Sequence, residues 1–251
     1  MQMTPEEGRA RERICLPLDG LHSMAEVRAL VEELSPLVGL FKVGKESFTR
    51  FGPEIVRRVQ EHGAGVFLDL KYHDIPNTVR GAARAAAEMG VRIFNVHASG
   101  GSAMMKAALE GVAEVGLEED RRPRVIAVTV LTSIDREILN SECGVPGPVV
   151  DQVLRLARLT QDSGLDGIVC SAADLEALAG QLNPGFLFVT PGIKGTTTPA
   201  GADQKRVMSP GRAVAAGSSL LVVGRAITGA QDRRAAAREI LQDIANVLSR
   251  D

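Results

Sequence analysis

The feature that most constrains the fold is a regular alternation of short apolar segments with longer segments of helical periodicity, which starts at residue 14. We expect strands at Ile14–Asp19, Leu40–Val43, Gly65–Lys71, Arg92–His97, Val125–Val130, Gly167–Cys170, Phe186–Thr190 and Leu220–Val223. We expect helices at Met24–Ser35, Phe48–Glu61, Thr78–Met89, Gly101–Gly116, Pro148–Gly164, Ala172–Ala179, Pro210–Ala216 and Arg233–Leu248. A strand and a crossover helix repeated eight times predict an α/β protein with a single (β/α)8 TIM barrel over residues 1–251.

A doubly wound open sheet is the main alternative fold. It normally has fewer such units and, for a dinucleotide ligand, a GxGxxG motif after its first strand. Here the residues that follow the first strand are Asp19–His22, reading DGLH, so the barrel is favoured.

Composition and charge exclude several classes of protein. The formal net charge is −2, which gives no overall basic field for nucleic acid. Residues 1–13 form a polar extension without the apolar run of a signal peptide, and no segment is apolar enough to span a membrane, so we expect a cytoplasmic protein with no membrane partner. The three cysteines lack CxxC spacing, which argues against a disulfide framework or a zinc site.

The third expected strand carries charge where a parallel sheet is normally apolar. Asp69 and Lys71 lie in its last residues and Asp74 follows it closely. Because side chains alternate along a strand, Asp69 and Lys71 should share one face, with Cα atoms roughly 6.6 Å apart. Charges buried there need mutual pairing or a charged ligand. The simpler interpretation is a structural ion pair, with Asp74 as the N-cap of the next helix.

Polar or backbone-permissive residues also follow most of the other expected strands. In a TIM barrel the active site lies at the carboxyl ends of the strands, so these residues should meet there. They are Asp19, Lys42, Asp69, Lys71, His97, Thr132, Ser133, Pro191, Lys194, Gly224 and Arg225.

A long polar loop, residues 191–207, follows the seventh strand. Loops of this length inside a compact domain are commonly functional, and we expect this one to close over the site. Phosphate is commonly held after strands seven and eight of TIM barrels, where Gly224 offers a backbone N–H and Arg225 a bidentate cation.

The segment Asp69–Thr78 reads DLKYHDIPNT and resembles the signature D-x-K-x-x-D-I-P-N-T of the orotidine 5′-phosphate decarboxylase family through its full length. Similar short segments occur along residues 14–248: Asp19, KVG at 42–44, VLTS at 130–133, PGI at 191–193, DQKR at 203–206 and VGR at 223–225. The family usually has Arg after PGI, whereas this chain has Lys194, which keeps the charge but loses the planar fork.

The resemblance implies a homodimeric barrel that converts orotidine 5′-monophosphate to UMP and CO2 in pyrimidine biosynthesis without metal or organic cofactor. It makes Lys71 the proton donor to C6 of the pyrimidine and Asp69 the carboxylate that faces the departing CO2. Lys42 and Asp74 complete the charged array, and Asp74 and Thr78 reach the neighbouring subunit's site. The remaining implied substrate contacts are Asp19 and Lys42 to ribose, Thr132 and Ser133 to the base, and Pro191, Lys194, Gln204, Gly224 and Arg225 around the phosphate.

Two other functions stay open at this point. A related sugar-phosphate barrel would use a similar D-x-K-x-x-D strand with Mg²⁺, which carboxylates such as Asp69 and Asp74 could ligate. Those relatives usually have Ala-Gly after the second Asp, where this chain has Ile75 and Pro76. A nucleotide-binding barrel without activity would bind UMP but would not convert any substrate. The intact Asp69, Lys71 and Asp74 argue against this function.

Overall fold

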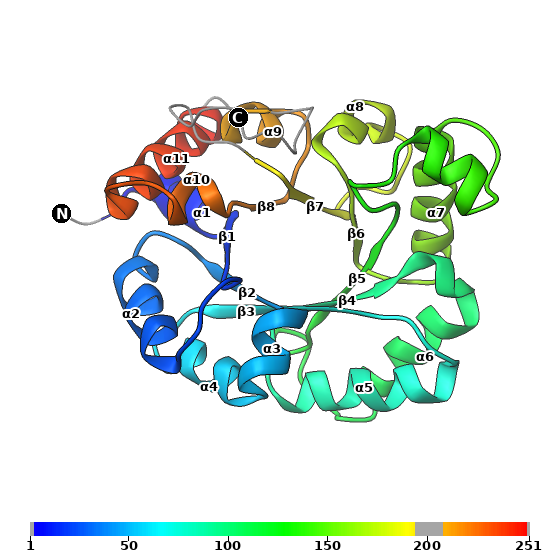
Figure 1. The fold of residues 1–251 in the computed structure, drawn as a ribbon, viewed down its shortest axis with the longest axis horizontal. Coiled ribbons are helices and arrows are strands. Elements are labelled where there is room, and N and C mark those ends of the chain that lie inside the picture. The colour runs from blue at the N-terminus through cyan, green and yellow to red at the C-terminus, as the bar shows by residue number, and fades with distance from the viewer. Residues whose placement is uncertain (1–2, 194–207, 250–251) are drawn as a thin grey trace. The chain divides into compact units, whose positions relative to one another are not determined.

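The computed structural model describes residues 3–193 and 208–249. Within these ranges eight strands form a closed barrel in the order β1 to β8, which confirms the predicted (β/α)8 fold (Figure 1). The strands are β1 (Ile14–Pro17), β2 (Leu40–Gly44), β3 (Gly65–Tyr72), β4 (Ile93–His97), β5 (Arg124–Val128), β6 (Gly167–Val169), β7 (Leu187–Pro191) and β8 (Leu220–Val222).

The described helices alternate with these strands. They are α1 (Pro5–Arg11), α2 (Met24–Leu34), α3 (Lys45–Phe51), α4 (Glu54–Gln60), α5 (Pro76–Glu88), α6 (Gly101–Ala113), α7 (Val149–Asp162), α8 (Leu175–Leu178), α9 (Pro210–Ala215), α10 (Arg225–Thr228) and α11 (Arg233–Leu248). Further short helical segments are η1 (Ala98–Gly100), η2 (Ile138–Glu142) and η3 (Ala172–Asp174). None of the described helices is long and apolar enough to cross a membrane.

Contacts divide the chain into two compact units, Met1–Asp69 with Thr190–Asp251, and Leu70–Val189. The assignment of the whole chain to one domain therefore stays a prediction. In the first unit β1 pairs in parallel with both β2 and β8, and β2 pairs with β3 so that Lys42 lies opposite Phe67 and Gly44 opposite Asp69. This register determines where the charged side chains of the unit emerge.

The N-terminal residues, expected only to be a polar extension, contain helix α1. Thr4 and Glu7 form a capping box in which each side chain accepts a hydrogen bond from the other residue's backbone N–H, and Pro5 occupies the first helical position. The helix packs beside α11, and Arg9 donates to the Leu248 carbonyl oxygen (Figure 1). The sequence TPEE carries this capping signal, so the helix could have been predicted.

The single helix predicted over Phe48–Glu61 is wrong, because the segment forms parts of two helices, α3 and α4. Gly52 adopts φ +62°, a left-handed conformation that ends α3, and Pro53 then precedes α4 as its N-cap. Glycine adopts this conformation at little cost, and proline cannot continue the hydrogen bonding of a preceding helix.

In the second unit, β4, β5, β6 and β7 pair in parallel in that order. Helices α5 and α6 lie side by side (Figure 1). A Cβ atom on Gly111 of α6 would lie 2.1 Å from the Arg80 carbonyl oxygen of α5, so only glycine permits this approach. The guanidinium of Arg80 also pairs with the Glu114 carboxylate. Helix α5 begins two residues after Asp74, so this packing fixes the helix in which the signature ends.

Candidate active site

The centre of the charged cluster in the first unit is Lys42 of β2. Its Nζ lies 3.0 Å from Asp19 Oδ2 and 3.3 Å from Asp69 Oδ2. The side chains of Lys42 and Asp69 are 12% and 11% exposed, whereas that of Asp19 is 45% exposed. One ammonium thus lies between a buried and a half-exposed carboxylate, and the sequence-predicted residues Asp19, Lys42 and Asp69 are brought together.

Gly44 provides the space for this cluster. A Cβ atom on Gly44 would lie 2.7 Å from Asp19 Oδ1 and 2.9 Å from Lys42 Nζ, closer than such contacts normally come. The sequence resemblance included Gly44 without giving it a role. A side chain at position 44 would displace the side-chain ends of Asp19 and Lys42 from these positions.

Burial and charge act in opposite directions on Lys42. Burial lowers the pKa of its ammonium, but the carboxylates of Asp69 and Asp19 together outweigh that effect and hold the pKa above its ordinary value. The neighbouring Cys15 thiol on β1 is fully buried, and burial is the main reason that its pKa is raised. Lys42 is therefore a fixed positive charge near neutral pH, and Cys15 is a neutral thiol.

Lys71 has an unusual backbone conformation. Among the described residues it is the one non-glycine residue with positive φ, at +52°. A residue held in this region costs about 1–3 kcal/mol and such residues are concentrated at functional sites. Lys71 lies within strand β3 but departs from regular strand geometry, and the alternation and spacing expected for Asp69 and Lys71 stay a prediction. Its backbone N–H donates to Asn95 Oδ1 on β4 at 2.8 Å.

Asp74 does not cap helix α5 as the simpler interpretation predicted. Its Oδ1 accepts a hydrogen bond from the Ile75 N–H at 2.6 Å, and Ile75 is the N-cap. Pro76 is the first helical residue and favours extended backbone in the residue before it, which places the cap at Ile75. Asp74 and Thr78 are both exposed, and Ile75 is 67% exposed. With His73, Pro76 and Gly100, Asp74 and Ile75 line a hollow of about 550 Å³.

Two ring contacts lie at the end of β3 in the second unit. Tyr72 packs against Phe94 with ring centroids 6.0 Å apart, and burial raises the pKa of Tyr72 to about 12. The rings of His73 and His97 lie 5.5 Å apart. Each of the two residues that follow Lys71 therefore makes a ring contact with a residue of β4.

The remaining predicted residues that the structure describes lie at or after the ends of strands. Thr132 and Ser133 are exposed in the turn after β5. Gly224 is the N-cap of the short helix α10, Arg225 is its first residue and is exposed, and Pro191 ends β7. Lys194 and Gln204 lie outside the described residues, as does nearly all of the expected closing loop.

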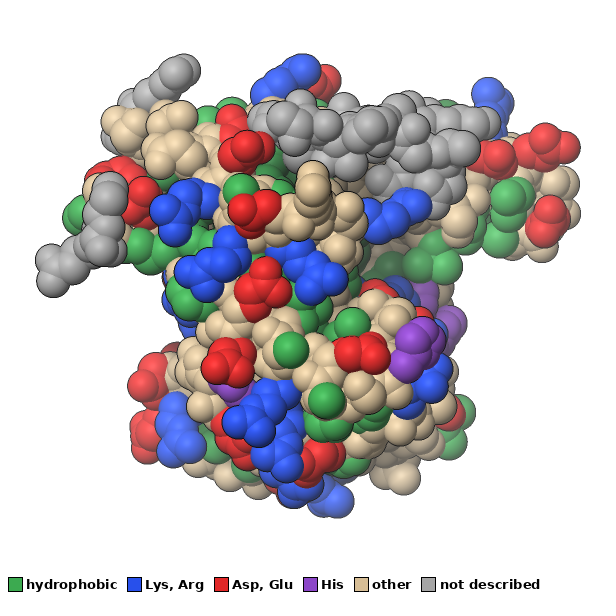
Figure 2. Space-filling view, turned by 60° about the vertical axis from the view of Figure 1, so that its left-hand side comes forward, with side chains coloured by type: hydrophobic (Ala, Val, Ile, Leu, Met, Phe, Trp, Pro, Cys, Tyr) green, Lys and Arg blue, Asp and Glu red, His purple; other side chains and the backbone are tan. Residues whose placement is uncertain are grey.

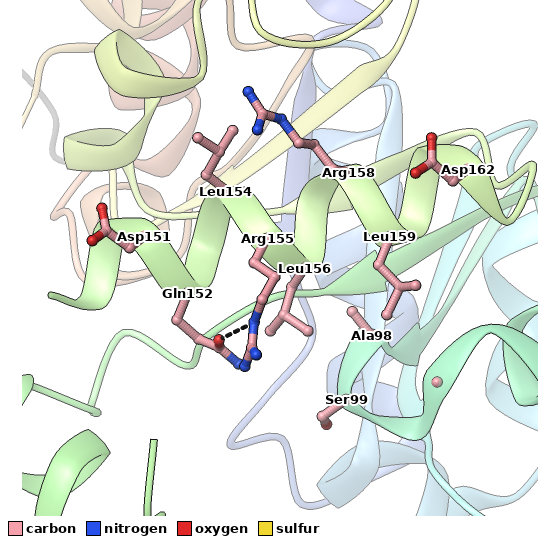
Figure 3. A pocket seen from close by; sticks show the side chains of 11 residues that line it. Ala98, Ser99, Asp151, Gln152, Leu154, Arg155, Leu156, Arg158, Leu159 and Asp162 are labelled. Atoms are coloured by element: carbon pink, nitrogen blue, oxygen red, sulfur yellow. Dashed lines mark hydrogen bonds between the residues drawn. The ribbon is translucent and has the colours of Figure 1, made fainter. Parts of the chain in front are cut away.

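A separate groove of about 760 Å³ lies between helix α7 and the start of α6 (Figure 3). Figure 3 shows Arg155 and Gln152 of α7 joined by a hydrogen bond. None of the predicted site residues that the structure describes lines this groove.

Figure 2 shows basic and acidic side chains interspersed over one face of the molecule.

Sequence reasoning missed two residues beside the predicted site, Asn95 and Tyr72. Asn95 is fully buried, and the signal for it was a polar residue within the apolar strand at residues 93–96. Tyr72 was part of the signature but had no assigned role.

A family model described as orotidine 5′-phosphate decarboxylase / HUMPS family matches residues 12–240. Orotidine 5′-phosphate decarboxylase of Moorella thermoacetica is 49% identical, over 94% of this chain and 93% of its own. The protein of the same name from Syntrophus aciditrophicus is 47% identical, over 99% of both chains. The crystal structure of orotidine 5′-phosphate decarboxylase from Lactobacillus acidophilus has a TM-score of 0.81 and 37% identity, over 93% of this chain and 99% of its own.

Proposed function

The chain belongs to the orotidine 5′-phosphate decarboxylase family, and we propose that it converts orotidine 5′-monophosphate to UMP and CO2 in cytoplasmic pyrimidine biosynthesis. The observation that carries the proposal is the buried ion pair between Lys42 and Asp69. Asp69 lies two residues before Lys71, which is held at positive φ. Buried charge and backbone strain both cost free energy, and where they occur together at one strand end they indicate a site for a charged ligand.

In the proposed reaction the bond between C6 and the carboxylate carbon breaks, and its electron pair stays on C6. The Lys71 ammonium donates a proton to C6, which gives UMP, and the neutral amine is then reprotonated from solvent. The pyrimidine ring delocalises the negative charge at C6 poorly, so a cation fixed in place before reaction provides the main stabilisation. Lys71 is suited to this role because it supplies both the charge and the proton.

We assign Asp69 to the position facing the departing CO2 and Lys42 to holding it there. The structure supports this assignment through the 3.3 Å Lys42–Asp69 contact and the burial of both side chains. The Lys42 ammonium already supplies a cation to both Asp19 and Asp69. Our proposal therefore contains no metal in the reaction.

The other substrate contacts follow from the positions of their elements. The half-exposed Asp19 can accept hydrogen bonds from ribose hydroxyls, and the exposed Arg225 can bind phosphate with the backbone N–H of Gly224. Thr132 and Ser133 are exposed and available to the base. We further assign Pro191, Lys194 and Gln204 to the phosphate side, where binding energy distant from C6 can drive loop closure.

We propose that the active enzyme is a homodimer with shared sites, in which Asp74 and Thr78 serve the partner subunit. Both residues are exposed, and they flank the exposed Ile75. Asp74→Asn and Lys71→Ala homodimers should each be inactive, and subunit exchange should restore activity, because every mixed dimer would hold one intact site and one that lacks both residues. If exchange is confirmed and activity does not return, the shared site is wrong.

The first test is the change in pyrimidine absorbance when purified protein is added to orotidine 5′-monophosphate in excess EDTA. We expect conversion to UMP that persists in EDTA and is absent with Lys71→Ala. Turnover of a sugar phosphate that depends on Mg²⁺ would instead assign the chain to the sugar-phosphate members of its family. Binding of UMP without any turnover would indicate a non-catalytic nucleotide-binding protein.

A further inference from the structure

Asn95 is a polar residue in the middle of an apolar strand. It lies on β4, where its sequence neighbours Phe94 and Val96 are buried and its own exposure is 0%. In the parallel pairing with β5 it lies opposite the buried Ile126. A buried primary amide is unfavourable unless its hydrogen bonds are made, so its partners indicate why it is there.

One partner is the backbone of Lys71. Asn95 Oδ1 accepts a hydrogen bond from the Lys71 N–H at 2.8 Å, across 24 residues of sequence. A residue with φ +52° departs from the backbone geometry of a regular strand. Its half-buried N–H nevertheless needs an acceptor, and a side-chain oxygen can take a position that the regular ladder does not offer.

We propose that Asn95 is a positioning residue for Lys71. Its amide oxygen stabilises the left-handed backbone at Lys71 and so determines the direction in which the lysine side chain leaves β3. The catalytic consequence rests on the proposed function, in which the ammonium must meet C6 of the substrate. The hydrogen bond itself does not depend on that function.

Position matters here because a lysine side chain has a flexible four-carbon stem. A backbone that relaxed to negative φ would start this stem in another direction, and the ammonium would reach C6 only in a fraction of its conformations. A displacement of about 1 Å at a reacting group can cost about 100-fold in rate. Substrate binding through distant ribose and phosphate contacts would change little.

Three variants separate positioning from a merely structural role. Asn95→Leu has a similar size but no acceptor, and Asn95→Asp keeps an oxygen at the same place. Thr160→Val is the matched control, because it removes the hydroxyl of a fully buried residue that donates to the Leu156 carbonyl oxygen within α7. Thr160 belongs to no predicted site.

For Asn95→Leu we expect kcat to fall about 100-fold with KM nearly unchanged. Asn95→Asp should recover much of the lost kcat, and Thr160→Val should keep the native kcat. If Asn95→Leu does not fold, Asn95→Ala takes its place with the same expectation. A folded Asn95 variant without the acceptor whose kcat matches that of Thr160→Val would overturn the proposal.

Exchange of the Lys71 backbone amide with solvent, followed by NMR, tests the hydrogen bond without any assay of activity. We expect slow exchange in the native protein and in Thr160→Val, and faster exchange in Asn95→Leu or Asn95→Ala. Equal exchange in all of them would overturn the positioning role. If the native protein did not turn over orotidine 5′-monophosphate, the proposed function would be wrong, and this measurement would still decide whether Asn95 holds Lys71.

Discussion

The Lys42 ammonium lies 3.3 Å from the Asp69 carboxylate, and each of the two side chains is only about one-tenth exposed. The Asp19 carboxylate lies 3.0 Å from the same ammonium but is 45% exposed. The two carboxylates thus lie at similar distances from Lys42, but Asp19 is far more exposed to solvent than Asp69. Because water screens an exposed charge, the two carboxylates should contribute very differently to stability.

The first prediction concerns this difference. Lys42→Met should lower the free energy of unfolding by about 3 kcal/mol, because it leaves the Asp69 charge buried without its cation. Asp19→Asn should lower it by less than about 1 kcal/mol, because its charge is partly solvated. Urea denaturation at neutral pH measures both values. Equal losses for the two variants would contradict the assignment of Asp69 as the buried partner.

The second prediction concerns backbone strain at Lys71. Glycine adopts positive φ without the penalty of a Cβ atom, so Lys71→Gly should be more stable than Lys71→Ala by about 1 kcal/mol. Both variants remove the proposed proton donor and should lack decarboxylase activity. Thermal and urea unfolding of the pair measure the strain directly. An alanine variant as stable as the glycine variant would indicate that Lys71 is not strained.

The third prediction uses Tyr72, the single tyrosine of a chain without tryptophan. Burial raises its pKa from 10.0 to about 12, so tyrosinate absorbance should develop near pH 12 in the folded protein and near pH 10 in urea. The folded state holds this proton more tightly. The resulting contribution to stability is complete below pH 10 and is lost as the pH rises toward 12. Titration of the folded protein near pH 10 would show that Tyr72 is solvated.

The fourth prediction compares two helical glycines. Gly111→Ala would place a Cβ atom 2.1 Å from the Arg80 carbonyl oxygen, so α5 and α6 must move apart, and we expect a loss of about 1–3 kcal/mol or more. A Cβ atom on Gly81 of α5 would have no neighbour within 4 Å among the described residues. Gly81→Ala should therefore stabilise the protein by about 0.5–1 kcal/mol. Urea denaturation of both variants checks this, and a neutral Gly111→Ala would mean that the helices do not pack so closely.

Local patterns in the sequence were sufficient to predict the barrel. Apolar runs such as 65–68 and helical periods such as 24–34 are properties of neighbouring residues, and their order along the chain leaves few topologies. Errors occurred where a local signal was overlooked. The capping box of α1 and the Gly52–Pro53 break between α3 and α4 could both have been predicted from the sequence.

The sequence by itself thus determined the order of strands and helices, the family, and which charged residues follow the strands. Only the tertiary structure decided that Lys42 lies between Asp19 and Asp69, and that Asn95 accepts a hydrogen bond from Lys71. The positive φ at Lys71 also could not be predicted from the sequence, because lysine has no preference for this conformation. These contacts join residues more than twenty positions apart, on or next to strands that are neighbours in the barrel.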